Sequence, residues 1–129
     1  MVTEEVVRKT FSPIETNEGS FPSYLADNIS WTLTGQDTPM AGHYTTKADL
    51  LERVFMSIYA RMDGPLKSKI TSILISGDWA VVEIKTEGVT KKGNKYVQEF
   101  CWICRYEGEI IVEVREYLDG ARLKRLLEE

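Results

Sequence analysis

The sequence has little of what several common kinds of protein depend on. Its 129 residues contain two cysteines and one histidine, too few for the usual zinc-binding clusters. The net charge of −4 gives no basic surface for nucleic acid, and no apolar run is long enough to span a bilayer. Neither a Gly-rich phosphate loop nor a nucleophilic triad is visible. We therefore predict no metal, no cofactor, no nucleic-acid partner and no membrane association.

The two cysteines, Cys101 and Cys104, are spaced as C-x-x-C, which can indicate a redox motif or half of a zinc site. They fall in a strand-like run, where residues three apart point to opposite faces. No second such pair is present, and His43 lies far away in the sequence. We interpret both cysteines as free thiols. Together with a charged N-terminus that lacks a signal-peptide core, this predicts a cytoplasmic location.

What is present predicts one α+β domain, residues 1–129. Periodicity and capping residues predict helices early in the chain and again at its end, and alternation predicts strands, mostly in the second half. We expect Pro13 to stop the first helix, Asp27-Asn28 to form a turn, and residues 35–42 to form a loop. The predicted helices are 3–11, a short one after Ser20, 47–62 capped by Thr46, and 120–128 capped by Asp119. The predicted strands are 29–34, 69–76, 79–88, 96–106 and 110–118. This grouping favours an antiparallel sheet with helices on one face.

Alternation divides each late strand into an apolar face, which we expect to pack against the helices, and a charged outer face. The apolar faces contain Val82 and Ile84, then Phe100, Trp102 and Cys104, then Val112 and Val114. The outer faces contain most of the charges together with Val81, Ile103, Ile111 and Tyr117. Because apolar and charged residues alternate there, we predict that the outer sheet face forms a homodimer interface.

Three polar residues fall on the apolar side: Thr86, Gln98 and Glu116. A buried carboxylate is costly unless it is paired or protonated. Glu116 therefore has a partner, has a raised pKa, or lies at a cavity reached by water or ligand. Alternatively it lies at a strand end, where it reaches solvent or pairs with a Lys or Arg.

Several segments resemble the NTF2-like cone fold and, locally, its SnoaL-like branch, which is related to ketosteroid isomerase. The resemblance covers about residues 11–127 and implies a curved antiparallel sheet with helices on its concave face and an apolar pocket between them. The fold hosts isomerases, cyclases, epoxide hydrolases, dehydratases and non-catalytic binders. The matching segments are LADNISW (25–31), AGHYTTK (41–47), GDWAVVE (77–83), CWI (101–103) and VREYLD (114–119).

The resemblance carries over the family's chemistry only in part. The isomerases' general-base aspartate matches Thr32, and their second acid falls in 100–102, where this chain has none. The epoxide hydrolases' Arg and Asp match Ile84 and Thr86, whereas their last aspartate matches Glu116. The resemblance therefore implies neither a steroid isomerase nor a limonene-type epoxide hydrolase.

Glu116 is the predicted general acid or base, because apolar surroundings would raise its pKa towards neutrality. His43 is the second catalytic candidate, since its ordinary titration range suits acid–base work, although a lone loop histidine is also often an exposed bystander. We predict either proton transfer on an apolar carbonyl or hydroxyl compound, or a non-catalytic binder or dimeric accessory protein. The predicted ligand-binding residues are Thr32, Phe55, Tyr59, Thr86, Gln98, Phe100, Trp102 and Val114.

Overall fold

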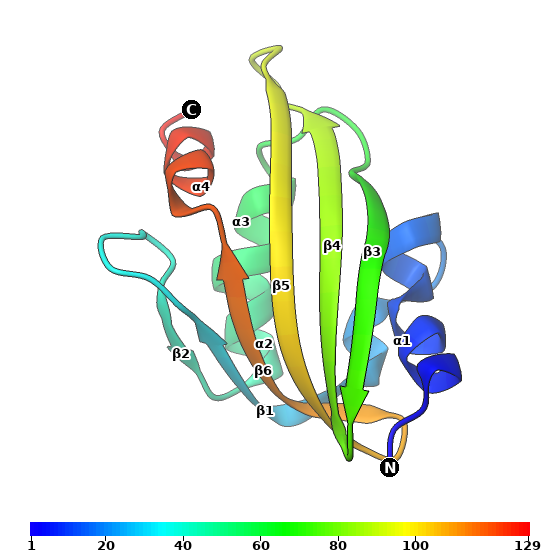
Figure 1. The fold of residues 1–129 in the computed structure, drawn as a ribbon. Coiled ribbons are helices and arrows are strands. Elements are labelled where there is room, and N and C mark those ends of the chain that lie inside the picture. Colours follow the sequence, from blue (N-terminus) through cyan, green and yellow to red (C-terminus); the bar gives the residue numbers. More distant parts are fainter.

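Six strands form one mixed sheet, and the helices cover one of its faces (Figure 1). The computed structural model describes residues 1–129. In the order β2-β1-β6-β5-β4-β3, every neighbouring pair is antiparallel except β1 and β6, which run parallel. The α+β prediction is confirmed, whereas the prediction of a wholly antiparallel sheet is wrong at this one pair. The strands are β1 (Leu25–Leu33), β2 (Gly42–Tyr44), β3 (Lys67–Ser76), β4 (Trp79–Val89), β5 (Lys95–Glu107) and β6 (Ile110–Leu118).

The first helix, α1 (Glu4–Thr16), continues through Pro13, so the predicted stop at that proline is wrong. Proline removes one backbone donor, but near the end of a helix few further bonds depend on it. The helix ends instead at Asn17, which adopts the left-handed conformation and donates its N–H to the carbonyl of Pro13 at 3.0 Å. A short 3-10 helix, η1 (Phe21–Tyr24), follows as predicted, with Pro22 in its first turn.

The long helix is present, but its centre is wound more widely than an α-helix. It consists of α2 (Lys47–Leu50), a π-helical turn η2 (Leu51–Phe55) and α3 (Met56–Tyr59). Thr46 caps it by accepting a hydrogen bond from the backbone N–H of Asp49, as the sequence predicts. The closing helix α4 (Gly120–Leu127) is capped in the same way by Asp119.

Pairing with a distant strand overrides one of the two local predictions for this part of the chain. The predicted turn at Asp27-Asn28 is wrong, because β1 already begins at Leu25, which pairs with Ile111 on β6. The predicted loop 35–42 is confirmed for residues 35–41, and Gly42 already begins the short strand β2, which pairs with the second half of β1. Turn propensity is a local preference, and the hydrogen bonds of an adjacent strand outweigh it here.

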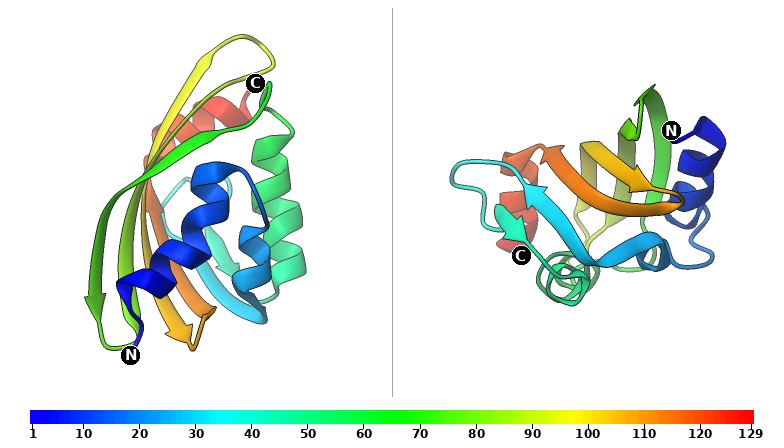
Figure 2. Two further views of the ribbon diagram at one scale, coloured as in Figure 1. Left: turned by 90° about the vertical axis from the view of Figure 1, so that its right-hand side faces the viewer. Right: turned by 90° about the horizontal axis from the view of Figure 1, so that it is seen from below.

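The sheet bends, and α1 and the long helix lie within its concave face (Figure 2). The predicted division of β4, β5 and β6 into inner and outer faces is confirmed at almost every position, including the buried Val82, Cys104 and Val114. The exceptions are Ile111, predicted to face outward but fully buried, and Val112, predicted to face inward but only half-buried and not packed against the core. A bulge explains both: Arg105 pairs with Glu113, but the next residue of β5 pairs with Ile111, which inverts the alternation.

Three further observations concern membrane-spanning helices, metal ligands and the cysteines. No helix combines the length and apolar character needed to cross a bilayer. No three His, Cys, Asp or Glu side chains are grouped so that they could hold a metal ion. Cys101 and Cys104 are both free, Cys104 being buried and Cys101 partly exposed.

Candidate functional site

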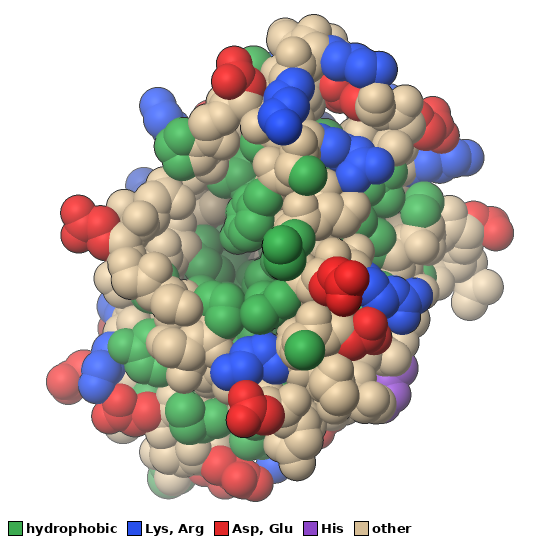
Figure 3. All heavy atoms as spheres, turned by 180° about the vertical axis from the view of Figure 1, so that it is seen from behind, with side chains coloured by type: hydrophobic (Ala, Val, Ile, Leu, Met, Phe, Trp, Pro, Cys, Tyr) green, Lys and Arg blue, Asp and Glu red, His purple; other side chains and the backbone are tan.

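An apolar cavity of about 310 Å³ lies between the concave face of the sheet and the helices. In the view from behind, hydrophobic side chains line a hollow in the middle of this face (Figure 3). Its floor comes from β3 to β6, and its walls from α1, η1 and the long helix. Met56 and Tyr59 stand at the mouth, 62% and 58% exposed. The cavity is at the small end of the ~300–1,000 Å³ range of ligand pockets.

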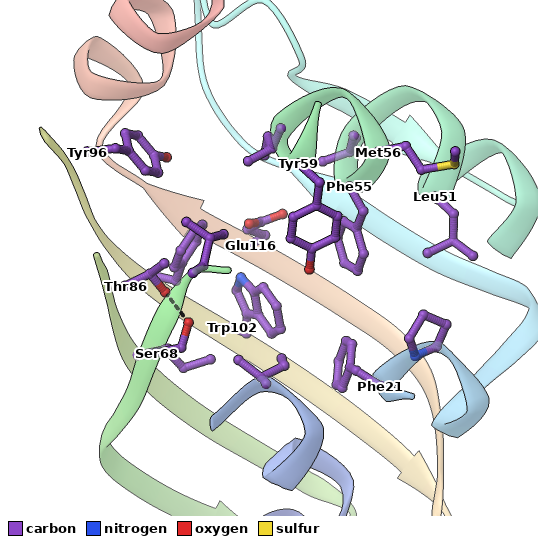
Figure 4. A pocket seen from close by; sticks show the side chains of 17 residues that line it. Phe21, Leu51, Phe55, Met56, Tyr59, Ser68, Thr86, Tyr96, Trp102 and Glu116 are labelled. Atoms are coloured by element: carbon purple, nitrogen blue, oxygen red, sulfur yellow. Dashed lines mark hydrogen bonds between the residues drawn. The ribbon is translucent and has the colours of Figure 1, made fainter. Parts of the chain in front are cut away.

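Glu116 is the one ionisable carboxyl that lines the cavity (Figure 4). Its side chain is 2% exposed, and its Oε1 accepts a hydrogen bond of 2.9 Å from the indole N–H of Trp31. The other oxygen, Oε2, receives no hydrogen bond from the protein. Burial raises the pKa of Glu116 to about 7, although the N–H groups of Trp31 and Trp102 lower it in part. Glu116 is therefore neither at an exposed strand end nor in an ion pair.

Trp102 lies directly opposite Glu116, on the neighbouring strand β5. Its ring is 6% exposed, and its Nε1 is fully buried without a hydrogen-bond acceptor in the protein. The N–H lies close enough to lower the pKa of Glu116 but outside hydrogen-bond geometry. The ring packs against Trp31 and Phe21, with centroids 5.1 and 5.6 Å away. These contacts fix the direction of the unpaired N–H.

Besides Glu116 and Trp102, the polar groups of the cavity wall are hydroxyl groups. Ser68 on β3 and Thr86 on β4 lie 2.8 Å apart and hydrogen-bond to each other (Figure 4). Tyr96 also lines the cavity, and its hydroxyl accepts a hydrogen bond of 3.3 Å from the amide of Gln98. The hydroxyl of Tyr59 points inward, which is why burial raises its pKa although its ring is more than half exposed.

The structure brings six of the ten predicted site residues to the cavity: Glu116, Phe55, Tyr59, Thr86, Phe100 and Trp102. Two others are internal but do not line it. Val114 is a core residue. The buried Gln98 bonds to backbone groups of Glu99 and Asp119, which gives its amide a structural use.

Thr32 and His43 lie away from the cavity, contrary to the prediction. Strand pairing sets Thr32 beside Arg115 and His43, so these side chains share the outer face of the sheet. The imidazole Nε2 of His43 is 2.8 Å from the hydroxyl of Ser30, in an exposed position. The sequence did not reveal the short strand β2, and this strand sets the face to which His43 belongs.

Trp31, which holds one oxygen of Glu116, is the residue of the candidate site that the sequence reasoning overlooked. Alternation groups Trp31 with Ile29 and Leu33 on the apolar side of its strand, so a signal for burial is present in the sequence. What the alternation could not reveal is that β1 lies parallel to β6, with Leu33 opposite Glu116. This pairing brings the indole N–H within reach of the carboxyl.

No family model matches the sequence, and no curated protein does. Solved structures match over nearly the whole chain. One is an NTF2-like protein from Burkholderia thailandensis, with a TM-score of 0.78 and 17% identity, covering 97% of this chain and 96% of that one. A second is TerC co-crystallized with polyporic acid, with a TM-score of 0.76, 13% identity and 97% of each chain covered.

A third is a protein with a ketosteroid isomerase-like fold from Catenulispora acidiphila, in complex with trimethylamine. It matches with a TM-score of 0.67 and 17% identity over 90% of this chain and 86% of that one. At these identities the matches concern the architecture, which is that of the NTF2-like and ketosteroid isomerase-like proteins.

Proposed function

Given the NTF2-like fold, we propose that the protein binds a small apolar molecule in the cavity and that Glu116 exchanges a proton with its carbonyl or hydroxyl function. One observation carries this proposal. A carboxyl that is 2% exposed faces an apolar cavity, with one oxygen held by Trp31 and the other free of protein contacts.

Proton transfer suits this carboxyl because its pKa is raised to about 7, so both protonation states are populated near neutral pH. As a carboxylate, Glu116 takes a proton from an acidic C–H or O–H, and the electron pair of that bond stays on the ligand. As an acid, it returns the proton to a ligand atom. The hydrogen bond from Trp31 to Oε1 leaves Oε2 for both steps.

The alternative is a binding protein without catalysis. Its support is that the cavity holds no second carboxyl, no histidine and no cation beside Glu116. The solved relatives named with ligands, TerC with polyporic acid and the Catenulispora protein with trimethylamine, support a ligand-binding cavity under either reading.

Deuterium exchange separates the two readings. The protein is mixed in D2O with α-tetralone, a small ketone with exchangeable C–H protons next to its carbonyl, and exchange is followed by mass spectrometry. The proposal expects the wild type and Glu99→Gln to accelerate exchange, and Glu116→Gln to accelerate it at least tenfold less. Glu99 is an exposed carboxylate on β5, so its variant controls for the amide substitution.

Binding without acceleration by any of the three proteins would support the non-catalytic alternative. A separate thermal-shift screen of apolar carbonyl and hydroxyl compounds, run on the same three proteins, identifies the preferred ligand. A compound that binds wild type and Glu116→Gln equally, and that neither changes, counts against catalysis.

We further propose that the protein forms a homodimer through the outer sheet face. This face carries Tyr117, 45% exposed, and the half-buried Val81 and Ile103 between charged side chains. The guanidinium of Arg115 lies over the ring of Trp79 there, 5.0 Å from its centroid. A mixed apolar and charged face suits a partner with the same surface.

A further inference from the structure

Trp102 presents a hydrogen-bond donor that the protein leaves unused. A buried donor without an acceptor costs about 1–3 kcal/mol, and such groups in native proteins generally have a reason. Here the donor lines a cavity, and aromatic neighbours on several sides hold its ring in place. Within the chain, the nearest acceptor is the carboxyl of Glu116, which the N–H approaches without reaching hydrogen-bond geometry. A ligand atom that binds between the two groups would supply the missing acceptor.

Glu116 presents the complementary group beside it. The two residues are direct partners across β5 and β6, so their side chains leave the sheet side by side on the concave face. In Figure 4 the ring nitrogen of Trp102 lies on the side that faces the carboxyl of Glu116. Because Trp31 already occupies Oε1, Oε2 is the carboxyl oxygen left without a protein partner, beside the buried Trp102 N–H that also has none. Both residues line the cavity.

We propose that one oxygen atom of the ligand binds between Nε1 of Trp102 and Oε2 of Glu116, and that the ligand is a flat ring compound carrying this oxygen as a hydroxyl or carbonyl group. The proposal rests on the proposed function in that it uses the same cavity and carboxyl. It does not depend on catalysis, since it concerns which compound is bound and by which atoms.

The two protonation states of Glu116 select different oxygens. With the carboxylate, a hydroxyl accepts from the Trp102 N–H and donates its own proton to Oε2, so every group is satisfied. With the protonated carboxyl, a carbonyl accepts from the Trp102 N–H and from the Glu116 O–H. A keto and an enol form of one compound thus fit the same two groups, and the proton is on Glu116 in one case and on the ligand in the other.

The lining disfavours other ligand classes. No Lys, Arg or His lines the cavity, so an anionic ligand would bring an unpaired charge next to Glu116. An ammonium ion would suit the carboxylate and the aromatic walls, but it would leave the Trp102 N–H unpaired. The small volume and the rings of Phe21, Phe55 and Phe100 favour a compact, flat ring compound.

The pH dependence of binding follows from Glu116 alone. The other titratable groups that act on it are Tyr44 on β2, and Tyr96 and Cys104 on β5. Burial raises the pKa of each above its ordinary value, so all three stay neutral through the neutral pH range. The same holds for Tyr59 at the mouth.

The experiment compares three bicyclic probes of similar size. Naphthalene has no oxygen, β-naphthol carries a hydroxyl group, and α-tetralone carries a carbonyl group. Affinities are measured by calorimetry at about pH 6 and pH 8. We expect both oxygen-bearing probes to bind at least about tenfold more tightly than naphthalene, because one buried hydrogen bond gives about that ratio and the oxygen makes two. Between the two pH values, α-tetralone should weaken relative to β-naphthol. Trp102→Phe, which keeps an aromatic ring, should reduce the preference for oxygen several-fold, because only the hydrogen bond with Glu116 remains.

A direct readout covers the case in which Trp102→Phe fails to fold. The protein has three tryptophans, so its nitrogen-15 spectrum shows three indole N–H signals, assigned with Trp31→Phe and Trp79→Phe. Both oxygen-bearing probes should move the Trp102 proton signal downfield, and naphthalene should not. Trp79 lies on the outer face and serves as the internal control.

The outcomes are distinguishable. Equal affinity for all three probes, or a Trp102 signal that responds to naphthalene as it does to α-tetralone, overturns the proposal while leaving an apolar binding cavity. Tighter binding of naphthylmethylammonium than of β-naphthol at pH 8 overturns it in favour of an amine site. No binding of any probe counts against both this proposal and the proposed function. Binding as expected without deuterium exchange supports the oxygen site and refutes only the catalytic reading.

Discussion

Replacing Glu116 by Gln should stabilise the protein at alkaline pH and have little effect at acid pH. Glutamine keeps the size of the side chain and can still accept the hydrogen bond from Trp31, but it carries no charge. The substitution therefore isolates the cost of burying the carboxylate. The cavity and the aromatic packing around it stay as they are.

The sign and size follow from the two pKa values. The pKa of this carboxyl is about 7 in the folded protein and 4.5 as an unperturbed glutamate. Between these pH values the folded chain keeps the proton while the unfolded chain loses it, so the free energy of unfolding falls as pH rises. The contribution is fully present below 4.5 and lost above 7. At about 1.4 kcal/mol per pH unit, the full contribution is about 3.5 kcal/mol, of which about 3 kcal/mol is lost between pH 4.5 and pH 8.5.

Urea denaturation followed by tryptophan fluorescence, from about pH 4.5 to pH 8.5, measures this effect. The difference in unfolding free energy between Glu116→Gln and wild type should grow by about 3 kcal/mol across that range and then level off. Other titrating groups cancel in the difference. Glu99→Gln changes an exposed carboxylate, so its unfolding free energy should differ from that of wild type by a constant amount at all pH values. A constant difference between Glu116→Gln and wild type at all pH values would refute the reasoning, because it would mean that Glu116 titrates alike in both states.

Three further predictions concern its surroundings. Trp31→Phe removes the donor that lowers the pKa of Glu116, so the pKa should rise further, which carbon-13 NMR of the carboxyl detects as a higher titration midpoint. Gln98→Met leaves the backbone N–H of Asp119 without its acceptor and should lower the unfolding free energy by about 2 kcal/mol in urea at neutral pH. Tyr117→Asp adds a charge to the proposed interface and should convert a dimer to monomer in light scattering, without loss of secondary structure; a wild-type monomer would refute the interface.

Local patterns were sufficient for much of the fold. Alternation predicted the inner and outer faces of β4 and β5, because a strand buried on one face must repeat with a period of two residues. Capping residues predicted where two helices begin, since Thr46 and Asp119 satisfy backbone donors within a few residues of themselves. Local rules failed at Pro13, because the helix tolerates a proline near its end. They failed also at Ile111, because a bulge inverts the alternation there.

By itself, then, the sequence determined that Glu116 lies on an apolar face opposite a strand rich in aromatic residues, because that follows from period and composition. Only the tertiary structure decided which groups meet it. The parallel pairing of β1 with β6 brings Trp31 to one carboxyl oxygen, while the pairing of β2 with β1 places His43 on the other face. Such pairings join residues far apart in the chain, and their register is set by the burial of the whole sheet, which no local pattern contains.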